Sequence, residues 1–436
     1  MQGARAAATP DSAQRTNAPI DRPLASVRVM TSSPPLPQRY LLGFMVLGML
    51  AGTSNGVAKV VLPLYAASLH ASPWQIGLVG GLQFTGMLLL SMPVGGLIDR
   101  HGSRPLFRFG GLAGAALYLL GFTQMDRPWQ LIAGVVLFGL LNPFRMVATQ
   151  TEFLHLLPRI GPRKAGWQRA SHSLGMFFVG PMLGAQLLGL LGYTGVFVVT
   201  GLGLLATVFV GDRVLSGAPP GRGRSATPLV ERLRGQVGII LSRRELRQSM
   251  LIELCGQMAM SYFAVFVVLI AIREFHLSVP QAASLVTIQG AVFVLTLLLA
   301  GGALSPLRDA ARYAIAFSLL LATELLLAFP LGVASLWLGA VLLGLGLGVQ
   351  HLTSVNRFAA LTAELGRGRV GGLFSLSGPA GGLIGAVAGG SLGQRFGLFS
   401  GFRVLAALYA VMMVWHGRGV LTENDQPVAL AEGESK

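Results

Sequence analysis

Residues 95–107 read GGLIDRHGSRPLF, and they join two long apolar runs at 76–98 and 105–125. Asp99, Arg100 and Arg104 bring charge into the short segment between these runs. A helix needs about 20 apolar residues to cross the hydrocarbon core of a bilayer. The stretch therefore predicts two antiparallel membrane helices that are joined by a short charged loop.

The composition of the whole chain supports a membrane protein. Of its 436 residues 53% are hydrophobic and only 11% are charged, whereas soluble domains carry about 25% charged residues. Irregular backbone cannot face lipid, so each apolar stretch is expected to be a helix. We predict an all-α integral membrane fold with twelve transmembrane helices, near 40–66, 76–98, 105–125, 129–153, 170–191, 195–212, 249–272, 281–303, 313–330, 333–356, 370–391 and 398–415.

The basic residues fix the expected orientation. With both termini in the cytoplasm, the cytoplasmic segments hold 26 of the 33 Lys and Arg residues, and the outer segments hold Arg127, Arg273, Arg395 and Arg403. This asymmetry is typical of the positive-inside rule. The net charge of +16 does not indicate nucleic-acid binding, because the basic residues lie in short segments between apolar runs.

The longest segment between apolar runs divides the predicted spans six and six. We expect a disordered cytoplasmic tail (1–39), an N-terminal six-helix bundle (40–212), a central cytoplasmic loop (213–248), a C-terminal six-helix bundle (249–416) and a second cytoplasmic tail (417–436). Met30 is an alternative start of the chain. A six-plus-six division indicates two halves related by duplication, as in many transporters.

Two short patterns recur in corresponding spans of the two halves. Arg145 precedes Glu152 by seven residues in the fourth span, and Arg357 precedes Glu364 by seven at the end of the tenth. Proline kinks a helix and glycine allows close helix contact. The fifth and eleventh spans therefore carry a predicted helix-packing motif, formed by Gly180, Pro181, Gly184, Gly378, Pro379 and Gly382.

The loop at 95–107 resembles the signature G-x-L-x-D-R-x-G-R-R-x-x-L of the major facilitator superfamily. Asp99, Arg100, Gly102 and Arg104 match, and Ser103 replaces a usual Arg. The resemblance covers about 40–416 and implies two pseudo-symmetric bundles that transport by alternating access. We expect an Asp99–Arg104 latch at a cytoplasmic gate, formed by Asp99, Arg100, Gly102, Arg104, Glu152 and Glu364, with Glu152 as an alternative partner of Arg104.

The fifth span also resembles a motif of that family which is associated with antiporters of the drug-exporter branches. Gly180, Pro181 and Gly184 match, whereas Met176 and Ala185 depart from the pattern. The resemblance implies export, and this motif is the feature of the sequence that favours export over uptake.

Charged residues inside a bilayer are costly, at about 2.5–3.5 kcal/mol each on insertion scales, and are candidates for function. In the family, spans one, four, seven and ten line the central cavity. The predicted cavity residues are Asn55, Lys59, Gln83, Asn142, Arg145, Gln257, Tyr262, Gln289, His351 and Arg357, and the candidate proton carriers are Glu253, Glu324 and His351. The structural alternatives are snorkelling to the interface for the charged residues and hydrogen bonds between helices for the others. Asn142-Pro143 is expected to break the fourth helix.

The sequence carries no Walker A motif and no arrangement typical of an enzyme, and its single Cys255 excludes an intramolecular disulfide. We expect no cofactor and no metal site. Lys59, Arg145 and Arg357 favour a substrate with an anionic group. We predict a proton-coupled exporter, monomeric and located in a bacterial inner membrane, whose partners are a small-molecule substrate, protons and lipid. The alternatives are uptake of an organic anion or sugar, and a non-transporting receptor or scaffold.

Overall fold

The computed structural model describes residues 38–160, 167–215, 243–365 and 367–418, and within these ranges the chain is helical and has no strand. The N-terminal half contains α1 (Gln38–Ser68), α2 (Pro73–Leu82), α3 (Thr85–His101), α4 (Ser103–Ala116), η1 (Leu117–Gly121), η2 (Phe122–Gln124), α5 (Pro128–Ile160), α6 (Trp167–Leu174), η4 (Gly175–Val179) and α7 (Gly180–Val214). The C-terminal half contains α9 (Arg244–Arg273), α10 (Val279–Leu304), α11 (Asp309–Leu327), α12 (Val333–Leu365), α13 (Arg367–Phe396) and α14 (Ser400–Gly417).

Nine helical segments of the described chain are long and apolar enough to cross a membrane. One of them, Trp167–Val214, carries two predicted spans because Gly192 interrupts α7 with φ 65° and ψ −176°. This φ lies in the left-handed region that glycine adopts readily. Two further helices, α13 and α14, lie at the predicted eleventh and twelfth spans. Exposed large side chains such as Leu120, Leu190 and Leu299 agree with lipid as the solvent.

The break that we expected in the fourth span lies in the second span instead. Helix α5 runs without interruption through Asn142 and Pro143, whereas Gln83 and Phe84 separate α2 from α3. At this break α5 approaches closely, since a Cβ on Gly139 would lie 2.8 Å from the carbonyl oxygen of Leu82. Contact with a neighbouring helix therefore interrupts the second span, while α5 accommodates its proline.

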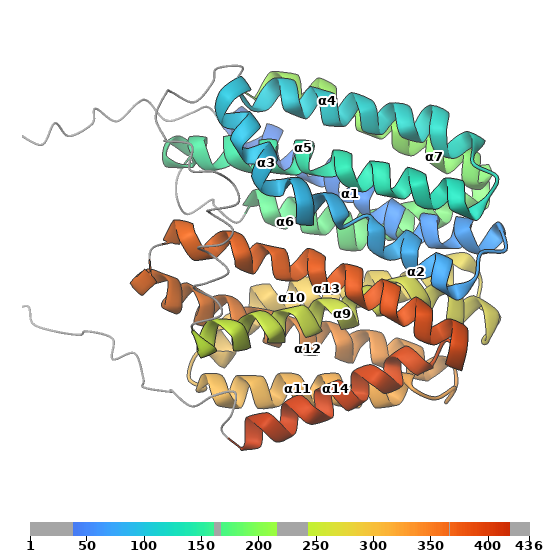
Figure 1. Cartoon of the computed structure of the whole chain (residues 1–436), viewed down its shortest axis with the longest axis vertical. Helices are drawn as coiled ribbons and strands as arrows, with labels where there is room; N and C mark the ends of the chain where they lie inside the picture. Colours follow the sequence, from blue (N-terminus) through green and yellow to red (C-terminus); the bar gives the residue numbers. More distant parts are fainter. Residues whose placement is uncertain (1–37, 161–166, 216–242, 366, 419–436) are drawn as a thin grey trace, which may run out of the picture.

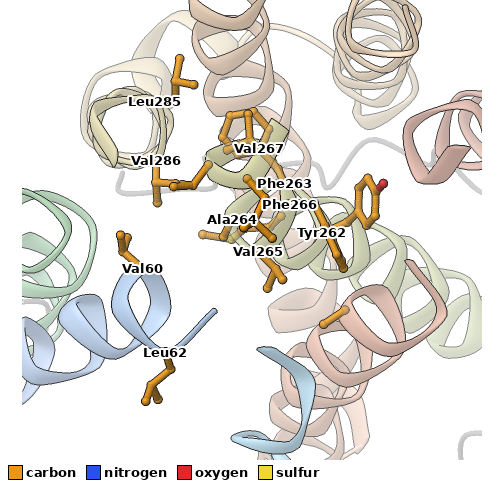
Figure 2. Close-up of a cluster of buried hydrophobic side chains, with 14 of the residues drawn as sticks. Val60, Leu62, Tyr262, Phe263, Ala264, Val265, Phe266, Val267, Leu285 and Val286 are labelled. Atoms are coloured by element: carbon orange, nitrogen blue, oxygen red, sulfur yellow. The ribbon is translucent and has the colours of Figure 1, made fainter. Parts of the chain in front are cut away.

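The helices form two bundles, as Figure 1 shows. Helices α1 to α7 lie in one bundle and α9 to α14 in the other, in the order that the six-plus-six division predicts. Buried apolar side chains continue from one bundle into the other. Figure 2 shows this core, where residues 262–267 of α9 lie beside Val60 and Leu62 of α1 and Leu285 and Val286 of α10.

The two bundles meet near one end of the molecule. We call this the turn end, because the turns at 69–72, 274–278 and 397–399 lie there, and we call the other end, with Arg100, Arg104, Arg213 and Arg312, the basic end. Helix α2 packs on α13 so closely that a Cβ on Gly77 would lie 2.5 Å from the carbonyl oxygen of Ala386. A Cβ on Gly95 of α3 or Gly378 of α13 would meet no atom within 4 Å. The bundles therefore contact each other at the turn end and stand apart towards the basic end.

The predicted helix-packing motif occupies close contacts within and between the bundles, with one exception. A Cβ on Gly180 would lie 2.6 Å from the Thr53 carbonyl oxygen. A Cβ on Gly56 of α1 would lie 3.0 Å from Cδ of Pro181. Gly184 faces Val57 and Val61 of the same helix. In the eleventh span Gly382 faces the ring of Phe84 across the contact between the bundles, whereas a Cβ on Gly378 would meet no atom within 4 Å among the described residues. Within the described residues Gly378 therefore shows no close helix contact.

Candidate functional site

A buried acid and an imidazole form the centre of the candidate site. Glu253 of α9 is only 4% exposed, and its Oε1 lies 2.9 Å from Nδ1 of His351 on α12. Gln257 follows one turn later on α9 and donates from Nε2 to the same oxygen at 3.1 Å. The other oxygen, Oε2, is buried and has no hydrogen-bond partner in the described part of the chain. Glu253 therefore keeps one free acceptor, which buried carboxylates rarely do.

This free acceptor borders a small recess. Its lining residues are Glu253, Gly256, Gln257, Met260, Phe293, Leu347, Gln350 and His351, and its empty volume is about 190 Å³ with the open space at its mouth included. Gln350 is held in place by its Nε2, which donates to the Ile252 carbonyl oxygen at 2.7 Å. The recess combines apolar walls with a few fixed polar groups.

Aromatic rings connect the recess with the N-terminal bundle. The centroid of Phe293 on α10 lies 5.9 Å from that of His351 and 5.9 Å from that of Phe177. Phe177 belongs to η4 of the N-terminal bundle. It packs so closely on α10 that a Cβ added to Gly290 would lie 2.4 Å from the Cβ of Phe177. Nζ of Lys59 lies 5.1 Å from the Phe177 centroid. The four side chains thus form a continuous path from α1 to α12 across the contact between the bundles.

The N-terminal bundle contributes basic groups to this region. Arg145 is 3% exposed, packs beside Gly110 of α4, and has a buried Nε without a hydrogen-bond partner in the described part. His172 of α6 lies 3.3 Å through Nδ1 from the Gly48 carbonyl oxygen. Of the described acids of this bundle, Asp99, Asp126 and Asp212 lie near helix ends, and Glu152 accepts a hydrogen bond from Ser103, the first residue of α4. The interior of the N-terminal bundle is therefore basic, whereas the recess in the C-terminal bundle holds an acid.

The structure unites some of the predicted cavity residues and separates others. Glu253, Gln257 and His351 lie together, and Asn55 lies one helical turn before Lys59 on α1. The buried Oδ1 of Asn142 and the buried Nε2 of Gln289 have no hydrogen-bond partner in the described part of the chain. Gln83 donates from Nε2 to the Gly80 carbonyl oxygen at 2.6 Å, which caps the helix break. Arg357 is half-buried towards the basic end of α12.

Two predicted residues lie in the C-terminal bundle away from the recess lining. The hydroxyl of Tyr262 donates to the Leu398 carbonyl oxygen at the turn end, and its ring packs edge-on against Phe402 at 4.8 Å. Glu324 of α11 is 1% exposed, and its Oε2 has no partner in the described part. Tyr262 thus contributes a helix contact, and Glu324 lies within the core of its own bundle.

At the predicted gate Arg104 contacts a different acid from the ones we expected. Its guanidinium donates to the carbonyl oxygen of Asp212 and lies 3.5 Å from the carboxylate of that residue. Arg108 reaches the same carboxylate at 2.5 Å. In the described part no ion pair joins Arg104 to Asp99, which is exposed. The latch therefore connects α4 with the end of α7, because α7 and not α3 presents its carboxylate to this arginine.

The remaining gate residues take different positions around this loop. Gly102 links α3 to α4 with φ 83°, a value that favours glycine. Arg100 is exposed. Ser103, the residue that departs from the family signature, donates its hydroxyl to the Glu152 carboxylate. The side chain of Glu364 lies outside the described residues.

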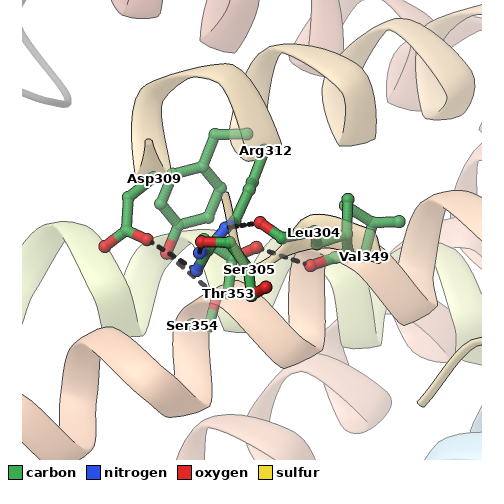
Figure 3. Close-up of polar contacts among 8 residues, drawn as sticks. Leu304, Ser305, Asp309, Arg312, Val349, Thr353 and Ser354 are labelled. Atoms are coloured by element: carbon green, nitrogen blue, oxygen red, sulfur yellow. Dashed lines mark hydrogen bonds and ion pairs between the residues drawn. The ribbon is translucent and has the colours of Figure 1, made fainter. Parts of the chain in front are cut away.

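The corresponding loop of the C-terminal bundle has its own arginine latch, which Figure 3 shows. Arg312 of α11 donates to the carbonyl oxygens of Leu304 and Ser305 at 2.9 and 3.1 Å and to Asp309 at 3.0 Å. The last carbonyl groups of a helix lack partners within the helix. Arg312 thus caps α10, just as Arg104 reaches the carbonyl of Asp212 near the end of α7.

Several residues of the site have no distinct signal in the sequence. Phe177 and Phe293 lie within apolar runs that hold many such residues, so nothing marks them before the helices are docked. By contrast, Asp212 at the end of the sixth span and Gln350 in the tenth stand out in the sequence, because each is a polar residue in an apolar run. In the described residues no group of three or more His, Cys, Asp and Glu side chains is placed to hold a metal.

The described helices form two bundles, and the C-terminal bundle holds a small recess beside a buried acid. A family model described as "Major Facilitator Superfamily" matches residues 44–252 and 249–429. The chain therefore belongs to the major facilitator superfamily, as its loop signature predicted, and it is a multi-pass membrane transporter.

Similar proteins agree with this family. Over 174 residues the chain is 30% identical to the "Multidrug resistance protein MdtG" of Serratia proteamaculans (strain 568), a match that spans 37% of this chain and 40% of that protein. The crystal structure of the nucleoside transporter NupG is similar, with 12% identity, a TM-score of 0.70 and coverage of 87% and 98% of the two chains. A bacterial homologue of the human lysosomal transporter Spinster, in an inward-facing and unoccupied conformation, is 15% identical with a TM-score of 0.67 and coverage of 88% and 96%. These structures share the fold.

Proposed function

We propose that this protein is a proton-coupled exporter of a small molecule with an anionic group, and that it works by alternating access. The observation that carries the proposal is the Glu253–His351 pair, which lies at 2.9 Å beside a recess and leaves one carboxylate oxygen free. A buried acid with a free oxygen can exchange a proton for a ligand group. Ionisable residues inside a membrane protein commonly mark such relays.

Export is supported by two further observations. The fifth-span segment with Gly180 and Pro181 resembles the motif of exporting antiporters, and its glycines pack α7 closely against α1. The partial match to a protein named for multidrug resistance agrees with this direction. Lys59 and Arg145 lie in the interior of a bundle whose described acids lie near helix ends or, for Glu152, beside the first residue of α4, which supports an anionic group on the substrate.

In the proposed cycle the two bundles, 40–212 and 249–416, rock against each other about the contact between them. The basic end faces the cytoplasm of a bacterium, with both termini on that side and the protein in the inner membrane. Arg104 with Asp212 and Arg312 with the end of α10 then lie on the cytoplasmic surface, where they hold helix ends together within each bundle. Because both latches join helices of one bundle, they keep each bundle rigid while it moves.

Metabolite profiling of cells tests this function. We would compare the medium and cytoplasm of cells that express the wild type, Arg145→Ala, the exposed-site control Arg127→Ala, or no protein, with membrane levels checked by immunoblot. Export predicts a compound that leaves the cytoplasm only with the wild type and Arg127→Ala. A compound that disappears from the medium instead indicates uptake of an organic anion or sugar. Identical profiles in all four strains would favour a non-transporting receptor.

A further inference from the structure

The two sides of the central region carry opposite charge, and each side lacks a partner for it within its own bundle in the described part of the chain. On the N-terminal side Lys59 contacts the face of Phe177, and the described acids of that bundle lie near helix ends or, for Glu152, beside the first residue of α4. On the C-terminal side Glu253 has its Oε1 occupied by His351 and Gln257 while its Oε2 remains free and buried. A charge that is buried without a partner is costly, so a bound ligand can supply what each side lacks.

Aromatic rings line the region between these charges. Phe177 and Phe293 lie 5.9 Å apart with their planes at 61°, and Phe293 lies next to His351. Rings in this arrangement offer faces and edges to a flat apolar group. Met260 and Leu347 extend the apolar wall on the side of Glu253.

We infer that the central site takes an amphoteric aromatic molecule, whose anionic group pairs with Lys59 and whose cationic nitrogen pairs with the free oxygen of Glu253. The flat body of the molecule lies against Phe177 and Phe293. This inference rests on the proposed function in that it takes the recess to be the substrate site, and it replaces a purely anionic substrate with one that carries both charges.

Both charges must contribute to affinity if this inference is right. A charge-assisted hydrogen bond in a site shielded from water corresponds to about ten- to hundredfold in affinity. A ligand that lacks either charge should therefore bind about tenfold or more weakly than the amphoteric one, because one side of the site stays unpaired. A site built only for anions would not distinguish the amphoteric molecule from its acid analogue in this way.

Three matched biphenyl compounds test the inference by direct binding. They are 4′-(aminomethyl)biphenyl-4-carboxylate, which carries both charges, biphenyl-4-carboxylate, which carries only the acid, and 4-phenylbenzylamine, which carries only the amine. Dissociation constants are measured by calorimetry at pH 7.5 on the full chain in lipid nanodiscs, without a gradient. We expect the amphoteric compound to bind at least about tenfold more tightly than either analogue.

Substitutions then assign each charge to its residue. Lys59→Gln should weaken binding of the amphoteric compound and the acid but not of the amine, and Glu253→Gln should weaken the amphoteric compound and the amine but not the acid. Arg127→Gln, at an exposed site on the turn end, is the matched control. If Glu253→Gln fails to fold, Lys59→Glu provides the second measurement, because it should transfer the preference to the diamine 4,4′-bis(aminomethyl)biphenyl.

The outcomes separate this inference from the proposed function. Equal affinity for the amphoteric compound and the acid, or no change with Lys59→Gln, would overturn the inference and leave an anion exporter intact. Binding as expected, together with an absence of any transported compound in cells, would instead contradict the proposed function while the ligand class stands.

Discussion

Replacing Gly180 by alanine should destabilise the protein through a single added methyl group. In the structure the new Cβ would lie 2.6 Å from the Thr53 carbonyl oxygen and 2.7 Å from the Cα of Gly56. Both neighbours are backbone atoms of α1, so no side chain can rotate away and the two helices must separate by several tenths of an ångström. Overpacking of this kind costs about 1–3 kcal/mol, whereas alanine regains up to about 1 kcal/mol of helix propensity.

The matched control lies on the same helix. Gly189 of α7 is exposed and a Cβ there would meet no atom within 4 Å, so Gly189→Ala should be neutral or stabilising by up to about 1 kcal/mol. Thermal unfolding of both purified variants in one detergent, followed by far-UV circular dichroism, measures the difference. We expect a lower midpoint for Gly180→Ala and an equal or higher one for Gly189→Ala. Equal shifts in the same direction would refute the close contact between α1 and α7.

Three further predictions concern the latches and the contact between the bundles. Arg104→Gln should lower the free energy of unfolding by about 1–3 kcal/mol, since it removes charge-assisted hydrogen bonds to the end of α7. The exposed control Arg100→Gln should stay near the wild type in thermal unfolding. Equal effects of the two substitutions would contradict the contact between Arg104 and Asp212. Arg312→Gln should lead to faster hydrogen exchange in the last turn of α10, measured by mass spectrometry, and unchanged exchange there would exclude its capping role. Gly77→Leu should increase the distance between spin labels placed on the turn ends of the two bundles, whereas Gly95→Leu should not, and an unchanged distance in Gly77→Leu would argue against the close approach of α2 to α13.

The order of the helices was predictable because the bilayer demands about 20 apolar residues for each span. The apolar stretch around Gly192 is too long for one span, so a turn between two spans was predictable there. The interruption at Gln83 and Phe84 was not predictable, because neither residue breaks a helix and the cause is the approach of α5. Conversely, Pro143 suggested a break that the helix absorbs.

The candidate site was predictable in its residue types and not in its contacts. Glu253 and Gln257 share a helix face by their spacing of four residues, and the structure gives them a hydrogen bond. The contact with His351 depends on how α12 docks against α9, which no local pattern encodes. Arg104 illustrates the same limit, since its partner Asp212 lies 108 residues away in the chain and nearer acids were the natural candidates.

Proton-driven transport by the wild type and by Glu253→Gln tests the central claim most directly. The compound that profiling identifies, or the amphoteric biphenyl if binding selects it, is supplied to inside-out vesicles with and without an imposed pH gradient. The account predicts that the wild type accumulates the compound only with the gradient and that Glu253→Gln, present at equal levels, accumulates none. Accumulation by Glu253→Gln at the wild-type rate, or accumulation by the wild type that ignores the gradient, would contradict it.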